Sequence, residues 1–170
     1  SVKLSSIVAQ LIIIDIEGSI DRVSEKMRVL YREAIKNGVF VNLDMEEYRD
    51  LPMTVVAFMR VLDEDEFAAM KAGIVLQAYL PESHHFFGEL VIWAKNRYEK
   101  SGGTIKVRLV KGANLAMERA EAELHGWSPA PYGSKSDVDA SFARLVDAAL
   151  RPEHSKAVRI GIASHNLFHM

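Results

Sequence analysis

The sequence of 170 residues contains no cysteine. This absence excludes disulfides, thiolate metal sites, iron–sulfur clusters and a cysteine nucleophile, and it fits a reducing compartment. Long hydrophobic runs are missing too. The longest apolar stretch, residues 7–16, contains Gln10 and Asp15 and is far shorter than the roughly 20 residues of a membrane-spanning helix.

An excess of positive charge is also absent. The 21 Lys and Arg stand against 23 Asp and Glu, which gives a net charge of -2 with both signs interspersed. Because nucleic-acid binding depends on a basic field, this balance argues against it. The chain has neither a G-x-G-x-x-G motif nor a P-loop, so any nucleotide cofactor would bind without a Rossmann fingerprint.

Short apolar runs alternate with long amphipathic stretches along the chain. The period of the apolar residues predicts helices over residues 20–35, 52–72, 86–98, 114–124 and 136–150. The second helix is expected to break near Asp63 to Asp65, and the last to be capped by Ser134 or Ser136. Apolar runs predict five strands, at residues 2–7, 39–44, 74–79, 104–110 and 158–163.

This alternation predicts the α/β class, with a parallel sheet and right-handed helical crossovers. Polar residues gather at or near the carboxyl ends of the last four strands, namely Asp44, Gln77, Arg108 with Lys111, and Ser164-His165-Asn166. A (β/α)8 barrel collects chemistry from many strand ends, whereas an open sheet concentrates it at one switch point. We therefore expect residues 1–170 to form one incomplete domain, an internal fragment covering about strands two to six of a TIM-like barrel.

Two cations, Arg108 and Lys111, flank the end of the fourth strand and lead into a turn of small residues. Together with free backbone N–H groups they predict an anionic or electron-rich ligand at the barrel mouth. The structural alternative is an ion pair with Asp44 or Glu46. Lys111 is also a candidate Schiff-base lysine.

Other strand-end residues have two interpretations each. Asp44 could hold a cationic substrate or act as a base, or it could cap a turn over residues 45–48. Lys3 is either functional or an edge lysine whose stem reaches to water. Gln77 has an amide suited to the edge of a flat heterocycle, and equally suited to a satisfied place in the interior. We assign Glu46 and Glu47 to the solvated face of a turn.

Two further groups bear on ligands. His165 and His169 have helical i, i+4 spacing, but no HExxH glutamate lies between them, so we predict no metal site. Around the long loop at residues 126–134, Tyr132, Lys135 and Asp139 are candidates to clamp an extended cofactor tail; a solvated loop and helix cap is the alternative.

Five ordered motifs resemble the proline dehydrogenase barrel of the bifunctional proline utilization A family. They are Val2-Lys3-Leu4-Ser5, Asn42-Leu43-Asp44-Met45-Glu46-Glu47, Leu76-Gln77-Ala78-Tyr79, Arg108-Leu109-Val110-Lys111-Gly112-Ala113 and Ala163-Ser164-His165-Asn166. The resemblance spans essentially all 170 residues. It implies a barrel that holds FAD and oxidises L-proline to Δ1-pyrroline-5-carboxylate, with a membrane quinone as acceptor, in a cytoplasmic protein that touches the inner membrane only peripherally.

The same resemblance implies roles for individual residues. Arg108 and Lys111 are similar to the family's flavin-contacting cations, and Gln77 to the residue that reads the flavin edge. Lys3 and Asp44 match residues on the substrate side, so the catalytic set is Lys3, Asp44 and Arg108. The resemblance also implies that Val110, Gly112 and Ala113 contact the flavin. The implied contacts with the nucleotide part are Tyr132, Lys135, Ser164, His165 and Asn166.

The fragment itself is expected to have little or no activity. The family's last barrel helix carries a paired arginine that holds the proline carboxylate, and that segment lies beyond Met170. A five-strand piece would expose two parallel edges, which favours self-association. The rival hypotheses are a Schiff-base aldolase that uses Lys111 and a non-catalytic module for flavin binding or assembly.

Overall fold

The computed structural model describes residues 1–8 and 15–164. Its strands are β1 (Val2–Lys3), β2 (Val41–Asp44), β3 (Ala72–Gln77), β4 (Ile105–Val110) and β5 (Val158–Ala163). The α-helices are α1 (Leu4–Ile7), α2 (Ile16–Lys36), α3 (Leu51–Leu62), α4 (Ser83–Ser101), α5 (Leu115–His125) and α6 (Lys135–Ala149). Short 3-10 helices lie at Tyr48–Asp50, Asp65–Phe67 and Pro152–His154.

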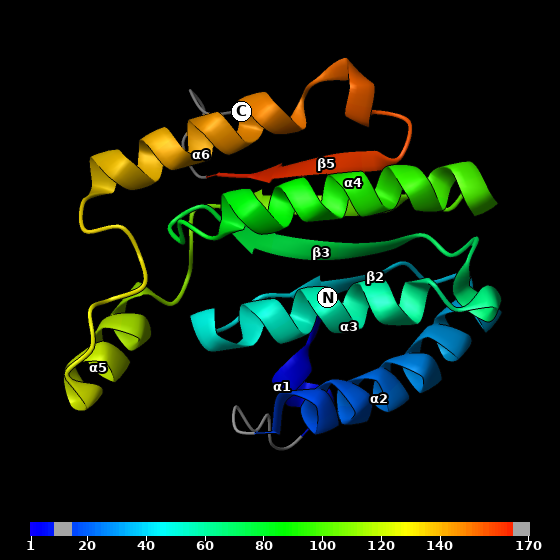
Figure 1. The fold of residues 1–170 in the computed structure, drawn as a ribbon, viewed down its shortest axis with the longest axis horizontal. Helices are drawn as coiled ribbons and strands as arrows, with labels where there is room; N and C mark the ends of the chain where they lie inside the picture. Colours follow the sequence, from blue (N-terminus) through cyan, green and yellow to red (C-terminus); the bar gives the residue numbers. More distant parts are fainter. Residues whose placement is uncertain (9–14, 165–170) are drawn as a thin grey trace.

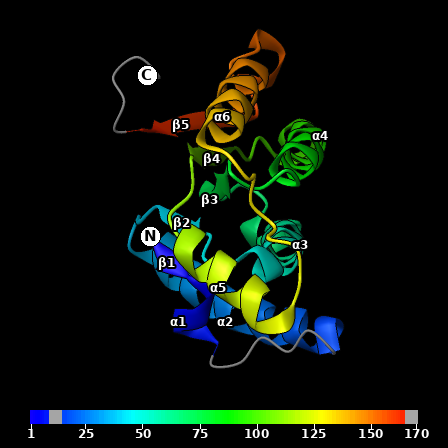
Figure 2. The same ribbon diagram turned by 90° about the vertical axis from the view of Figure 1, so that its left-hand side faces the viewer.

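The five strands form one parallel sheet in the order β1-β2-β3-β4-β5, so each strand pairs with the next along the chain. Figure 2 looks onto the carboxyl ends of the strands, which follow a curve with α2, α3, α4 and α6 on its outer side. Sequential parallel pairing with helices on one side is the arrangement of a TIM barrel. The fold is therefore α/β and consistent with a partial barrel, as the sequence predicted.

Local signals set most helix boundaries. The Asp15 side chain caps α2 by accepting a hydrogen bond of 3.0 Å from the Gly18 N–H. Ser134 caps α6, as predicted, by accepting from the Asp137 N–H. Helix α4 ends at Gly102, whose φ of 73° is a left-handed conformation that glycine adopts at no steric cost.

Three predicted strands differ from the structure by two residues or more, and the second begins at Val41 instead of residue 39. Only residues 2–3 of the predicted strand 2–7 pair with β2, and Leu4–Ile7 form the one-turn helix α1 instead, with Leu4 buried. The third strand begins at Ala72 and ends at Gln77, two residues earlier than predicted. Gly73, the residue after the helix predicted over 52–72, lies within this strand. The long helix predicted over 52–72 does break, because α3 ends at Leu62 and a 3-10 turn follows.

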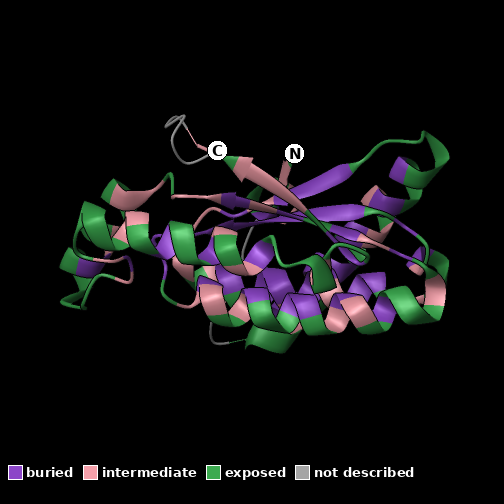
Figure 3. Cartoon of the chain, turned by 90° about the horizontal axis from the view of Figure 1, so that it is seen from above, coloured by how far each residue is buried: buried purple, intermediate pink, exposed green. Residues whose placement is uncertain are grey.

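The core lies between the sheet and the helices (Figure 1, Figure 3). Strand residues Leu43, Ile74 and Leu109 and the helix residues Phe58 and Leu90 are all 0% exposed. Burying each such side chain contributes about 1.5–3 kcal/mol. Within residues 1–8 and 15–164, no helix covers the opposite, concave face of the sheet in Figure 2. The outer helices therefore fix the strands, and the concave face is available for a site.

Candidate active site

The strand register places one row of side chains across the concave face. Lys3 pairs with Asp44, and Val75 pairs with Arg108. The adjacent strand positions Leu43, Ile74 and Leu109 are buried under the helices. Because neighbouring residues of a strand point to opposite faces, the row of Lys3, Asp44, Val75 and Arg108 faces away from the helices.

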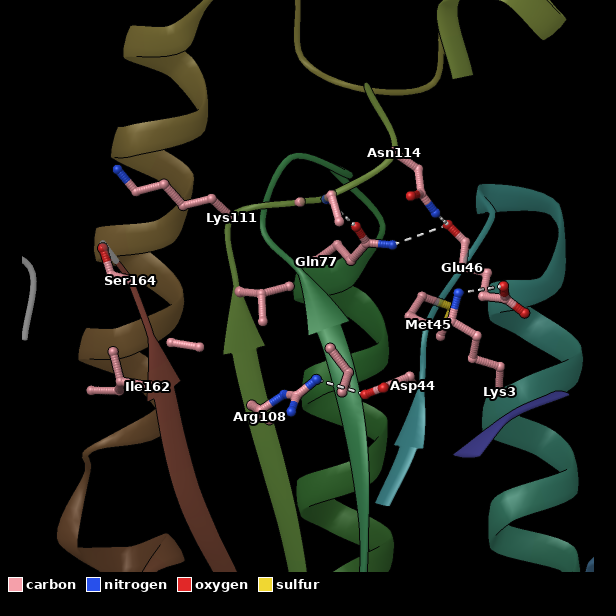
Figure 4. Close-up of a pocket in the computed structure, with 15 residues that line it drawn as sticks. Lys3, Asp44, Met45, Glu46, Gln77, Arg108, Lys111, Asn114, Ile162 and Ser164 are labelled. Carbon is pink, nitrogen blue, oxygen red and sulfur yellow. Dashed lines mark hydrogen bonds and ion pairs between the residues drawn. The ribbon is translucent and has the colours of Figure 1, made fainter. Parts of the chain in front are cut away.

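Arg108 and Asp44 meet across this row. The Arg108 Nη2 donates to Asp44 Oδ1 over 2.6 Å, from β4 to β2, and the bond passes in front of β3 (Figure 4). The side chains are 36% and 23% exposed. The ion pair between Arg108 and Asp44, which the sequence analysis considered as the alternative to ligand binding, is thus present. The short helix that follows at Tyr48–Asp50 has no side-chain cap, so Asp44 does not cap it. The Arg108 Nε is buried and has no hydrogen-bond partner, so one donor of the guanidinium remains available.

Glu46 holds Lys3 at the edge of the sheet. Lys3 Nζ lies 3.1 Å from Glu46 Oε1, and the Ser5 hydroxyl donates to the same carboxylate. Burial raises the pKa of Glu46, but the hydrogen bonds from Ser5 and Lys3 outweigh burial and leave the pKa below its usual value. Glu46 is therefore an ionised partner of Lys3. Its assignment to a solvated turn face was wrong, because its side chain is only 19% exposed and lines the cavity.

Gln77 joins the loops after β2 and β4 to the carboxyl end of β3. Its Oε1 accepts from the Ala113 N–H over 3.0 Å, and its Nε2 donates to the Glu46 carbonyl oxygen over 3.4 Å. The Asn114 amide donates to the same carbonyl oxygen. With 1% of its surface exposed, Gln77 fits the interpretation of a satisfied interior amide while still lining the cavity.

The turn after β4 passes very close to Tyr79. Gly112 has a φ of 144°, and a Cβ atom there would lie 2.5 Å from the Tyr79 ring. The Tyr79 N–H donates to the Lys111 carbonyl oxygen over 2.8 Å, which fixes the turn against the end of β3. Burial raises the pKa of Tyr79 to about 12. Only glycine suits this position.

Lys111 points away from the centre of the cavity, toward α6 (Figure 4). Its ammonium forms an ion pair with Asp139, not with Asp44 or Glu46, and lies 5.7 Å from the centre of the Phe142 ring. Lys135 binds the other Asp139 oxygen at 2.6 Å. The Tyr132 N–H donates to the Tyr79 carbonyl oxygen over 2.8 Å. Neither Tyr132 nor Lys135 lines the cavity, and His165, His169 and Asn166 lie outside the described residues.

One cavity of about 620 Å³ unites these groups at the carboxyl ends of the strands. This volume is in the range of small-molecule and cofactor sites. Sequence reasoning assigned no site role to Met45, Val75, Asn114, Ile162 or Ala163, and it weighed Glu46 as an ion-pair partner of the strand-end cations but favoured a solvated turn face. The lining residues are Lys3, Asp44, Met45, Glu46, Val75, Gln77, Arg108, Val110, Lys111, Gly112, Ala113, Asn114, Ile162, Ala163 and Ser164.

The cavity combines three cations, two carboxylates and an unsatisfied buried donor on Arg108. Such a set can bind a ligand that carries or develops negative charge. In residues 1–8 and 15–164 no three His, Asp or Glu side chains are grouped to hold a metal ion. None of the helices in the same residues is long and apolar enough to cross a membrane.

Comparison with known proteins gives a consistent result. The family model described as proline dehydrogenase matches residues 1–170. A hydroxyproline dehydrogenase of Rattus norvegicus is 30% identical over 118 residues, which cover 68% of this chain and 25% of that protein.

Solved structures agree with this sequence match. Proline utilization A from Corynebacterium freiburgense superposes with a TM-score of 0.95 at 54% identity, covering 99% of this chain and 18% of that one. Proline utilization A from Bdellovibrio bacteriovorus, inactivated by N-propargylglycine, gives 0.91 at 35% identity, with 99% and 17% covered. The chain thus spans about a quarter or less of these relatives.

Proposed function

The chain belongs to the proline dehydrogenase family, and from this premise we propose that it forms the flavin-facing part of an enzyme that oxidises L-proline to Δ1-pyrroline-5-carboxylate. The observation that supports this most strongly is the cavity at the carboxyl ends of the strands, where Arg108, Asp44 and Lys3 lie in one row. We propose FAD as the cofactor and a quinone as the final electron acceptor.

The residues of the cavity fit a flavin in three respects. The buried Arg108 Nε lacks a partner, and the Arg108 guanidinium adds positive charge at the same point. Gly112 and Ala113 bring backbone to the cavity wall without bulky side chains. When bound, FAD would supply the acceptor for the hydride that proline loses.

Each cavity residue has a proposed part in this chemistry. Arg108 would favour the reduced cofactor by lying beside the negative charge that reduction develops. Gln77, Val110, Lys111, Gly112 and Ala113 would hold the flavin, and Ser164, His165, Asn166, Tyr132 and Lys135 its nucleotide part. Lys3 and Asp44 lie at the other end of the row and would position the substrate, whose two lost hydrogens convert the ring C–N bond to C=N.

We propose that proline oxidation requires more of the protein than these 170 residues. The concave face carries charged residues, and no helix of the described residues covers it, so water would reach the substrate side of the cavity. We expect proline-dependent reduction of a dye acceptor by a protein of the relatives' length that contains this segment, and little or none by the 170-residue chain. Hydroxyproline is the comparison substrate, given the name of the rat relative.

The matched variant for this assay is Arg108→Met in the longer protein. It should lower turnover with proline strongly while leaving the circular dichroism spectrum unchanged. Full turnover in that variant, or no proline-dependent turnover in the longer protein, would contradict the proposed function.

The contacts of Lys111 disfavour the Schiff-base alternative. A nucleophilic lysine needs a free lone pair, whereas the Lys111 ammonium forms an ion pair with Asp139. Borohydride trapping of a carbonyl compound on Lys111 would revive the aldolase hypothesis. For the assembly hypothesis, the molecular mass in solution at two concentrations is decisive, because a monomer at both would exclude pairing through the sheet edges.

A further inference from the structure

Lys111 is held by helix α6, which contributes no described residue to the cavity wall. Lys111 lines the cavity, and its side chain points toward α6, where the ammonium lies beside Asp139 and the Phe142 ring (Figure 4). These two residues are three apart on the helix and therefore share one face. The ion-paired side chains are only 26% and 27% exposed.

Helix α6 is a rigid support for this contact. Phe142 and Leu145 are 1% and 0% exposed in the core, and Ser134 caps the first turn. A carboxylate on such a helix keeps a fixed position relative to β4. A lysine side chain has four rotatable carbon–carbon bonds and loses its geometry easily without a partner.

Asp139 is also ionised at neutral pH. Hydrogen bonds from Lys111 and then Lys135 lower the pKa of Asp139 to about 2. Of the two lysines, Lys135 is 84% exposed and belongs to the same helix, whereas Lys111 comes from the end of β4. The bond to Lys111 is thus the one that joins two elements.

We propose that Asp139 is a positioning residue, which holds the Lys111 ammonium at the α6 side of the cavity and so sets where a negatively charged part of the ligand is met. Both Asp139 oxygens already accept from lysines, so Asp139 acts through Lys111 and not as a direct clamp on a cofactor tail. The functional part of this inference rests on the proposed FAD site. The positional part concerns only residues of this chain.

The positional part is tested without any cofactor. Competitive acylation with acetic anhydride, read by mass spectrometry, reports the reactivity of each lysine. Asp139→Asn should raise the labelling of Lys111 about fivefold, because a change of this size is expected when one partly exposed ion pair is lost. Asp139→Glu should restore most of the protection, because it keeps the carboxylate. Asp147→Asn, which alters an exposed aspartate of the same helix, is the matched control and should change nothing.

The functional part is tested by titrating FAD into the same variants. Asp139→Asn should weaken FAD binding about fivefold or more, and Asp139→Glu should recover it. Unchanged Lys111 labelling in a folded Asp139→Asn variant would overturn the proposal even if FAD binds. A wild-type chain that binds no FAD would instead refute the proposed flavin site, and the labelling result would still decide the role of Asp139.

Discussion

The ion pair between Arg108 and Asp44 gives the sharpest prediction about the energetics of the cavity. It joins β4 to β2 across Val75, with a donor–acceptor distance of 2.6 Å. Two unit charges about 4 Å apart attract by about 4 kcal/mol at an effective dielectric constant of about 20. Loss of hydration and of side-chain freedom offsets much of this.

The exposure of the two side chains decides how much the ion pair contributes to the free energy of unfolding. The two side chains are 36% and 23% exposed, so the pair lies between a surface salt bridge and a buried one. Surface pairs contribute about 0–1 kcal/mol, and removing one partner of a buried pair costs about 3–5 kcal/mol. We expect Asp44→Asn to lower the free energy of unfolding by about 2 kcal/mol, and the coupling energy of the pair to be about 1–2 kcal/mol.

A double-mutant cycle measures this coupling. The wild-type chain, Asp44→Asn, Arg108→Met and the double variant are unfolded in urea and followed by circular dichroism. In thermal unfolding, Asp44→Asn should lower Tm by about 4–8 °C for a chain of this size. A coupling energy below about 0.5 kcal/mol would refute the view that this pair ties the strand ends together.

Three further predictions concern individual positions. Burial, followed by the charge of Glu47, raises the pKa of Asp50 from 3.8 to about 6. The folded state therefore binds the extra proton, and stability should fall by about 1–2 kcal/mol as pH rises through about 4–6; Asp50→Asn should remove this loss in urea unfolding at a series of pH values. Gly112→Ala should cost about 1–3 kcal/mol because of its positive φ and the nearby Tyr79 ring, whereas Gly133→Ala, with open space around it, should be neutral in the same thermal melts. Glu46→Gln should cost about 0.5–1 kcal/mol at pH 7 and progressively less as the pH falls from 4.5 through the lowered folded-state pKa of Glu46, because protonation of the carboxylate removes its stabilising contacts.

Each of these has an outcome that would count against it. For Asp50, the reasoning fails if the variant keeps the wild-type pH profile. For Gly112, equal melting of the two alanine variants would show that the turn tolerates a side chain. For Glu46, a stability loss of the same size at pH 3 and pH 7 would mean that the Lys3 ion pair is not its source.

Most of the fold could be predicted from sequence because the helices are long and amphipathic. Helix α2 shows this best, since the helix predicted over residues 20–35 lies wholly within it and ends one residue before it does. The start of the chain could not be read in the same way. Residues 4–7 are apolar at both ends with two serines between, which suits one helical turn as well as a strand.

The end of β3 was misplaced for a related reason. Tyr79 and Leu80 are 2% and 0% exposed although they lie beyond the strand, so apolar character alone does not separate strand from turn here. Burial comes from the chain that folds back over them, such as the backbone hydrogen bond from Tyr132 to Tyr79. Contacts between distant segments leave no local pattern in the sequence.

The strand ends revealed most of the candidate site, because residues that follow parallel strands converge at one edge. Asp44, Gln77, Arg108 and Lys111 all line the cavity for this reason. Glu46 was assigned to a solvated turn face, yet the alternation of Asn42, Asp44 and Glu46 was a usable signal for the site. The partner of Lys111 could not be found this way, since Asp139 lies 28 residues away on a helix whose placement depends on the tertiary fold.

The most direct test of the account is the visible absorption spectrum of the purified chain after FAD has been added and the excess removed. We predict that the wild-type chain retains the flavin bands and that Arg108→Met loses most of them, while Asp44→Asn keeps them because Arg108 remains in place. A folded wild-type chain that is colourless, or an Arg108→Met variant as yellow as the wild type, would contradict the claim that this cavity is built for a flavin.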